Sequence, residues 1–576
     1  MMTVRARSAP CADCGSSHRG GGYMKRKTWI ASLVIFAMST ASLFAMGQTE
    51  NSASKAKHIL TIGREGNNSF TRNFNPFSPS SLVGVVTPVS IYEPLLIWDP
   101  ANNKTIPWLA TSWEWGNGGG TLTFTTRENV KWSDGKSFSA ADVAYTFKLL
   151  QKSFAGGGFD YIKSVEATGP NTVVFTFKQP YSPALYEIGK QVIVPEHIWQ
   201  KIADPVSYAN PDPVGTGPFT QVAVFQTQLF ELDKNPYYWQ KGKPYIDGIR
   251  YPAYPGNDQV QLALINGDVD WADIFIPNVQ ATYASKSPDY HYWFTPTSYT
   301  TALIMNTTKA PFNDPIVRKA VSMSINREQG IAAEGDTGYT TPIEDATGLS
   351  NALDSWRDPA ALQGSTDWTK YNVELANSML DQAGYPRGSD GIRVDHSGKK
   401  ISGDIIVGCA STDWTADSEV IAQNLKSIGF DINVHCEDWG LVVDQLQKGN
   451  FTMAHTWTGA GSTPYDFYRW TMSTEEAKPI GTVTNENYGR YGNKEATDLL
   501  RQFAATFDST AQHQIVNKLE KIFVDNAPVA PLFSNPDWGE YSTARFTGFP
   551  NKDNPYALLE TRLPTAVLVL TNVKPK

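Results

Sequence analysis

The potentially reactive residues of this chain match no recognisable catalytic motif. The sequence has no G-x-S-x-G, no H-E-x-x-H and no G-x-x-x-x-G-K phrase. Gly215-Thr216-Gly217 lacks the third glycine of a dinucleotide-binding loop, so we interpret it as a turn. The eight histidines do not cluster at ligand spacing, and we expect His455 to take a core or hydrogen-bonding position. We therefore expect no enzyme, no metal site and no cofactor.

Aromatic residues are the stronger chemical signal. The chain has 17 Trp, and most of them must pack in a core, as we expect for Trp98, Trp108, Trp132 and Trp239. A few would line a ligand site. Sugar rings stack their C–H faces on aromatic rings, and their hydroxyl groups need amide, carboxylate or backbone partners. The abundance of Trp is therefore compatible with a saccharide ligand.

Six residues could supply such a site. Aromatic faces could come from Trp457, Tyr465 and Trp414. Hydrogen-bonding partners for the hydroxyl groups could come from Asn67, Asn75 and Asp466. A plainer interpretation is that Pro464 only shapes a loop and that Asp466 caps the helix that follows.

The first 47 residues have the pattern of a secretory signal. Lys25-Arg26-Lys27 precedes an apolar run from Trp29 to Met38, and small residues follow near Ala45 and Gly47, where we expect cleavage. Residues 24–47 are thus the predicted signal peptide, and 1–23 an upstream extension. Removing both changes the net charge from −8 to −13, which argues against nucleic acid or an anionic membrane as partner.

The four cysteines fall into two pairs. Cys11 and Cys14 have no second pair at zinc-like spacing, so we assign them no metal or redox role. No cysteine lies at the expected cleavage point after the apolar run, where a lipid anchor would need one, so we expect a periplasmic protein without a lipid anchor. Cys409 and Cys436 end two predicted strands of one βαβ unit, where either a disulfide or two buried thiols would fit.

The elements that would position a site have clear local signals. In residues 122–150 an alternating strand leads to an Asp-Gly turn at Asp134, and Ser139 begins a helix with Asp142 at the third position. Further on, 405–407 is predicted as a buried strand, Gly429 ends a helix, and 432–436 is the next strand. Ligands gather at the carboxyl ends of such strands, which places residues 411–414 and 437–439 near a cleft.

The 122–150 phrase resembles the signature of the family 5 extracellular solute-binding proteins, the receptors of peptide, nickel and oligosaccharide ABC importers. Other landmarks of that family appear in the same order, listed here: Phe74-Asn75-Pro76-Phe77, Asn235-Pro236-Tyr237-Tyr238-Trp239, Leu262 to Asp270, and Asn306 to Arg327. The resemblance implies an α/β fold, a two-lobed periplasmic binding protein of type II with an extra β-rich subdomain in lobe one. It assigns residues 48–298 and 534–576 to lobe I, with 89–212 inserted, and 299–533 to lobe II.

The ligand expectation comes from a departure from the peptide-binding members. Those members place an Arg before a Trp and an Asp after it. With Trp457 as the anchor, Ala454 and Ala460 occupy these positions here. Because an unpaired buried ammonium is costly, such a site should discriminate against free peptides. The Thr463-Pro464-Tyr465-Asp466 phrase resembles the cellobiose-type branch instead.

We therefore expect a monomeric receptor that binds a β-linked oligosaccharide such as cellobiose, laminaribiose or mannobiose and delivers it to an ABC importer permease. The expected ligand-binding residues are Trp457, Tyr465, Trp414, Asp466, Asn75, Asn67, Phe77 and Trp439. Two alternatives stay open, an oligopeptide receptor with charged groups elsewhere in the cleft and a secreted glycan-active enzyme.

Overall fold

A computed structural model describes residues 56–78, 87–102, 104–154, 158–336 and 338–576. The predicted upstream extension, the signal peptide and the Cys11–Cys14 pair lie outside these residues. Within them, no helix is both long enough and apolar enough to cross a membrane.

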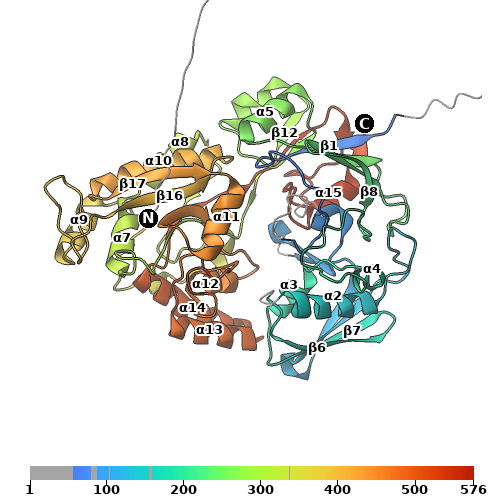
Figure 1. Ribbon diagram of the computed structural model, residues 1–576, viewed down its shortest axis with the longest axis horizontal. Helices are drawn as coiled ribbons and strands as arrows, with labels where there is room; N and C mark the ends of the chain where they lie inside the picture. Colours follow the sequence, from blue (N-terminus) through green and yellow to red (C-terminus); the bar gives the residue numbers. More distant parts are fainter. Residues whose placement is uncertain (1–55, 79–86, 103, 155–157, 337) are drawn as a thin grey trace, which may run out of the picture. The chain divides into compact units, whose positions relative to one another are not determined.

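The first large sheet gathers strands from both ends of the described chain (Figure 1). Its order is β12-β21-β11-β1-β10-β9-β8. The bounds are β1 Ile59–Gly63, β8 Phe219–Gln226, β9 Leu229–Lys234, β10 Gly248–Pro252, β11 Trp271–Ala272, β12 Tyr290–Tyr292 and β21 Glu540–Ser542. Around it lie α4 Glu196–Trp199, α5 Asn257–Asn266, α6 Val279–Thr282, α15 Ala566–Asn572 and the pair β22 Phe546–Thr547 and β23 Lys574–Pro575. We call this part lobe I.

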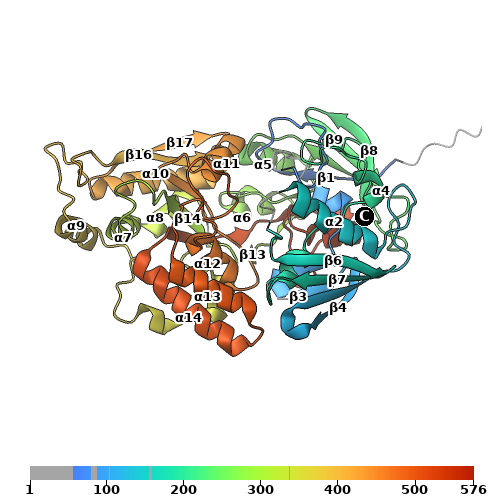
Figure 2. The ribbon, with the colours of Figure 1, turned by 60° about the horizontal axis from the view of Figure 1, so that its bottom comes forward.

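The second large sheet has the order β15-β19-β14-β18-β16-β17 and forms lobe II. Its bounds are β14 Thr301–Met305, β15 Thr341–Pro342, β16 Ser402–Gly408, β17 Asp431–Glu437, β18 Met453–Trp457 and β19 Ala530–Ser534. Its helices are α7 Pro315–Ser324, α8 Arg327–Glu334, α9 Val373–Gln382, α10 Thr412–Ser427, α11 Trp439–Lys448, α12 Pro464–Met472, α13 Lys494–Ala505 and α14 Ser509–Asn526. Figure 2 shows α13 and α14 as one helical layer of this lobe.

The predicted βαβ unit of lobe II is confirmed. β16 and β17 pair in parallel, and α10 connects them. Ile421, Leu425 and Ile428 are all fully buried, as their helical spacing predicts. Gly429 follows the helix with a φ of 81°, a left-handed conformation that favours glycine.

Two short segments connect the lobes. The chain leaves lobe I through β13 (Thr295–Pro296) and returns through β20 (Pro536–Asp537), and these two strands pair antiparallel. Among the described residues, one large apolar core lies in lobe I and another, drawn from residues 302–533, in lobe II. The two lobes are therefore separately packed, although the exact residue boundaries that we assigned to them remain predictions.

Lobe I carries the expected additional β-rich part. Its four-stranded antiparallel sheet has the order β4-β5-β7-β6, with bounds Ala110–Gly116, Thr121–Thr126, Thr172–Phe177 and Ile162–Gly169. Beside it lie β2 (Leu96–Asp99), β3 (Lys104–Pro107), α2 (Ala140–Ser153) and α3 (Ala184–Gly189). The capping box predicted for α2 is present, since Ser139 accepts from Ala141 N and Asp142 accepts from Ser139 N.

A buried carboxylate joins this additional part to lobe I. Glu93 accepts hydrogen bonds from Trp108 Nε1 at 2.8 Å, Tyr238 Oη at 3.1 Å and Trp239 Nε1 at 3.1 Å. Burial still raises the pKa of Glu93 to about 7. Trp108 and Trp239 are therefore packing residues, as we expected.

Candidate functional site

Three tryptophans from separate elements of lobe II meet at one place. The ring centroids of Trp414 and Trp457 lie 6.0 Å apart, those of Trp439 and Trp457 5.0 Å, and those of Trp414 and Trp439 6.4 Å. Trp457 is 37% exposed, and the other two are partly buried. We call Trp414, Trp439 and Trp457 the Trp cluster.

Sheet topology brings the cluster together. β16 runs parallel to both β17 and β18, so the carboxyl ends of these strands share one edge of the sheet. Trp457 ends β18, Trp414 lies in the first turn of α10 after β16, and Trp439 begins α11 after β17. Gly408 is required beneath Trp439, because a Cβ there would lie 2.5 Å from the indole ring.

A disulfide joins the two loops that carry Trp414 and Trp439. Cys409 and Cys436 are bonded, with their Cα atoms 4.9 Å apart, and Cys409 N donates to Glu437 O. Of the two possibilities left open by the sequence, the structure contains the disulfide. It fixes the spacing of the strand ends from which α10 and α11 start.

His455 supports the cluster from inside the lobe. It is fully buried, as predicted, and its ring stacks on Trp414 at 5.2 Å with an interplanar angle of 20°. Its Nδ1 lies 3.0 Å from Ser418 Oγ and 3.5 Å from Asp417 Oδ2. Burial lowers the pKa of His455 to about 3, so the imidazole is neutral at physiological pH.

This shift predicts an acid-sensitive stability. The unfolded chain binds a proton at His455 below pH 6.5, and the folded chain does not until about pH 3. Between these pH values, each unit by which the pH falls should lower the free energy of unfolding by about 1.4 kcal/mol because of this residue. His455→Gln should remove this slope. Urea unfolding of both proteins from pH 7 to pH 4 measures it, and parallel curves would contradict the assignment.

A glycine-rich loop leads from the Trp cluster to α12. Thr458 holds its start by donating from both N and Oγ1 to Thr300 O. Gly461 lies so close to α12 that a Cβ would meet Asp466 Oδ2 at 1.8 Å. Thr463 caps α12 by accepting from Tyr465 N, and Pro464 takes the first helical position. Thr463, not Asp466, therefore caps this helix.

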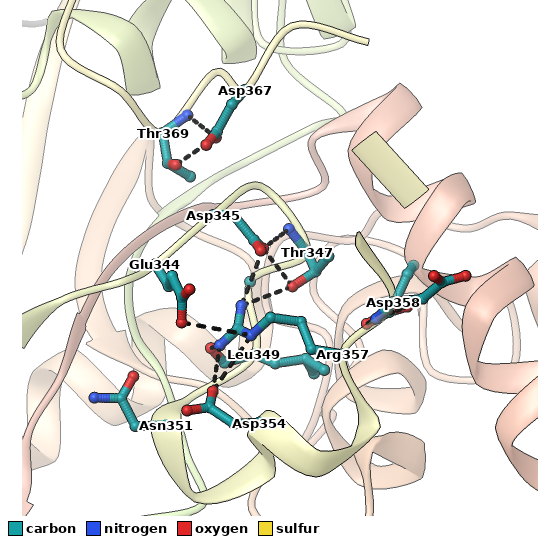
Figure 3. A network of polar contacts seen from close by, with 12 residues as sticks. Glu344, Asp345, Thr347, Leu349, Asn351, Asp354, Arg357, Asp358, Asp367 and Thr369 are labelled. Atoms are coloured by element: carbon teal, nitrogen blue, oxygen red, sulfur yellow. Dashed lines mark hydrogen bonds and ion pairs between the residues drawn. The ribbon is translucent and has the colours of Figure 1, made fainter. Parts of the chain in front are cut away.

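A polar network around Arg357 holds the loop of residues 345–349 (Figure 3). Arg357 donates to Asp345 Oδ1 at 3.0 Å, to Asp354 Oδ1 at 2.9 Å and to Leu349 O at 2.8 Å. The loop held in this way presents Thr347 O to Tyr468 Oη of α12 at 3.1 Å. Residues far away in the sequence thus hold α12, the helix that carries Tyr465 and Asp466.

Beyond the loop lies a cavity of about 230 Å³ between α3 and α12. Lobe I contributes Leu96, Trp98, Thr105, Ser182, Pro183, Leu185, Tyr186, Gly189 and Lys190, and lobe II contributes Ser462, Thr463, Tyr465, Asp466, Phe503 and Gln512. Aromatic rings and polar groups thus line the same space.

The two predicted residues of this cavity differ in what they offer. Tyr465 is only 5% exposed; its ring stacks on Phe503 at 5.3 Å, and its hydroxyl lies 3.3 Å from Tyr181 Oη. It is thus no open stacking platform. Asp466 Oδ1 lies 4.0 Å from Arg469 Nη2. Burial raises the pKa of the Asp466 carboxyl above its usual value, and the Arg469 guanidinium offsets part of that rise.

The remaining predicted residues lie in lobe I, away from the cavity wall. Asn67 is buried and donates to Glu65 O at 3.0 Å, while the neighbouring Asn68 reaches Asp438 Oδ2 at 3.5 Å. Asn75 is fully buried, and its amide nitrogen donates to the backbone carbonyls of Pro205 and Tyr208.

Phe77 packs edge-on against Phe154 and Trp199. Because packing uses Phe77 and backbone carbonyls use the amide of Asn75, we do not include either residue in the proposed site.

Sequence reasoning missed the lobe I wall of the cavity. We expected Trp98 to pack; it lines the cavity and meets Tyr186 edge-on at 6.4 Å. Lys190 lies over the Tyr186 ring at 4.4 Å. The only sequence signal for this wall is the aromatic and basic character of 186–190, which many surface helices share.

Comparisons with known proteins agree with this architecture. The family model described as bacterial extracellular solute-binding proteins, family 5 (middle part) matches residues 104–479. The glutathione-binding protein GsiB of Escherichia coli K12 is 26% identical over 80% of this chain and 86% of its own. The nickel-binding periplasmic protein of the same strain is 26% identical over 82% and 88%.

Solved structures share the fold. A periplasmic oligopeptide-binding protein of Thermotoga maritima, solved with mannohexaose bound, superposes with a TM-score of 0.82 at 25% identity and covers 91% of this chain and 99% of its own. The oligopeptide-binding protein AppA of Bacillus subtilis, with a nonapeptide, gives 0.76 at 20% identity over 91% and 100%.

Proposed function

Because this chain belongs to the family 5 extracellular solute-binding proteins, the substrate receptors of ABC importers, we propose that its solute is a β-linked oligosaccharide such as cellobiose, laminaribiose or mannobiose. The observation that carries the proposal is the Trp cluster. An indole 37% exposed at the carboxyl edge of a sheet, backed by two further indoles, is a platform for the C–H face of a sugar.

The neighbouring positions favour a neutral ligand at this platform. Ala454 is fully buried in β18, and Ala460 is exposed in the glycine-rich loop, so neither brings a charge beside Trp457. A peptide ammonium placed there would lose its hydration without gaining a carboxylate. The mannohexaose in the Thermotoga maritima protein adds support, because that protein shares the fold over nearly its full length.

An oligopeptide solute is the second candidate, and the cavity between α3 and α12 favours it. Lys190 and Asp466 line the same space, one cationic and one acidic, and could receive the two charged ends of a peptide. The names of the relatives, which include oligopeptide and glutathione receptors, agree with this choice. The two candidates differ in whether charge on the solute is required.

A fluorescence titration separates them. Protein from residue 48 onward is titrated with cellobiose, laminaribiose, mannobiose and di- to pentapeptides, each peptide also in a form with a blocked amino terminus. Saturable quenching or a blue shift with a disaccharide alone is the result expected. Binding of free but not blocked peptides would instead establish the oligopeptide function.

The cellular setting follows from the same proposal. We place the protein in the periplasm, as a monomer that presents its solute to a membrane permease. It acts without turnover, so cellobiose or laminarin fragments incubated with it should be recovered unchanged. Release of glucose at a rate proportional to protein concentration would contradict this and support a glycan-active enzyme.

A further inference from the structure

Contacts outside the two connecting strands also join the lobes, and one group of them involves the additional β-rich part of lobe I. Phe507, in the loop between α13 and α14 of lobe II, meets Trp115 of β4 in lobe I, with ring centroids 4.7 Å apart at 70°. Gly119 of the β4–β5 hairpin is buried beneath the Phe507 ring, where a Cβ would approach to 2.2 Å. Its φ of 89° also favours glycine.

Hydrogen bonds extend this contact toward the cavity. Ser182, just before α3 in lobe I, donates from its N to Ala504 O at 2.6 Å and from Oγ to Phe503 O at 3.4 Å. Gln512 of α14 donates to Ser182 Oγ at 3.4 Å. We call the contacts of Trp115, Gly119 and Ser182 with Ala504 and Phe507 the clasp.

We propose that the clasp sets the affinity of the receptor by stabilising the arrangement seen here, in which both lobes line the cavity and which we call closed, with Phe507 as its principal residue. Phe507 does not line the cavity and belongs to no element of the Trp cluster. Any contact made only when the lobes meet raises the closed population and lowers the apparent dissociation constant for every solute alike. The additional β-rich part of lobe I would thus act as a closing element.

Opening the lobes would expose apolar surface that the clasp covers. Phe507 is an apolar ring at a loop tip, 45% exposed even with Trp115 against it. Separating the lobes would expose the rest of both rings to water and break the hydrogen bond from Ser182 N to Ala504 O. These costs favour closure, and the two rings do not contribute to the choice of solute because neither Phe507 nor Trp115 lines the cavity.

The test measures closure without any ligand, so it does not depend on the proposed saccharide. Spin labels are placed at Lys148→Cys in lobe I and Lys494→Cys in lobe II, two exposed positions. Phe507→Ser should add a population with a longer distance between the labels. Phe507→Leu should restore most of the short distance, and Tyr371→Ser, at an aromatic residue 53% exposed elsewhere in lobe II, should change nothing.

A second variant distinguishes loss of the contact from local misfolding caused by Phe507→Ser. Trp115→Ala removes the partner ring from lobe I and should open the lobes too, while Trp115→Ala with Phe507→Ser should open them no further than either alone. With a bound disaccharide or peptide, Phe507→Ser should raise the dissociation rate about tenfold and leave the relative preference among solutes unchanged. Unchanged label distances, or additive effects of the two substitutions, would overturn the proposal.

Discussion

Trp457→Ala is expected to weaken saccharide binding at least about 30-fold, a loss of roughly 2 kcal/mol that is typical of a buried aromatic anchor. The indole is the most exposed of the Trp cluster, and both of its aromatic neighbours lie within 6.0 Å. Without it, a sugar ring loses its stacking face, and Trp439 and Trp414 gain exposure to water. A calorimetric titration of the variant with cellobiose measures the effect. Calorimetry is used because the substitution removes one fluorophore.

The conservative substitution makes this result specific. Trp457→Phe keeps a flat apolar face and should bind within a few-fold of the wild type. Since Trp457 is 37% exposed at the end of β18, the Ala variant should keep its far-UV circular dichroism. A folded Trp457→Ala protein with unchanged affinity would remove the Trp cluster from the site.

Replacing both Cys409 and Cys436 by Ser is expected to lower the free energy of unfolding by about 3 kcal/mol, from the entropy of the released loop. The two residues are 27 apart in sequence, and the loop between them contains all of α10 and most of β17. Denaturant unfolding followed by circular dichroism measures the loss. A reductant should shift the transition of the wild type in the same direction.

The same substitution should also weaken solute binding several-fold. The bond fixes the spacing between the starts of α10 and α11, which carry Trp414 and Trp439. The double Ser variant with added reductant is the control, because it has no bond left to reduce and should not change further. An unfolding midpoint equal to that of the wild type would contradict a stabilising disulfide.

The sequence alone determined much of the local structure, because the signals involved are short-range. The capping box of Ser139 and Asp142 and the left-handed Gly429 each depend on a few neighbouring residues. The βαβ unit of lobe II also follows from periodicity, and the parallel-strand rule placed the loops of Trp414 and Trp439 at one edge.

Tertiary structure decided what each candidate side chain offers. The amide of Asn75 is bound by carbonyls about 130 residues away, and the ring of Tyr465 stacks on Phe503. The lobe I wall of the cavity, with Trp98 and Lys190, meets α12 only in the folded chain. Long-range packing assigns each of these groups its partners, whereas the aromatic content and spacing of the chain determine only which groups are present.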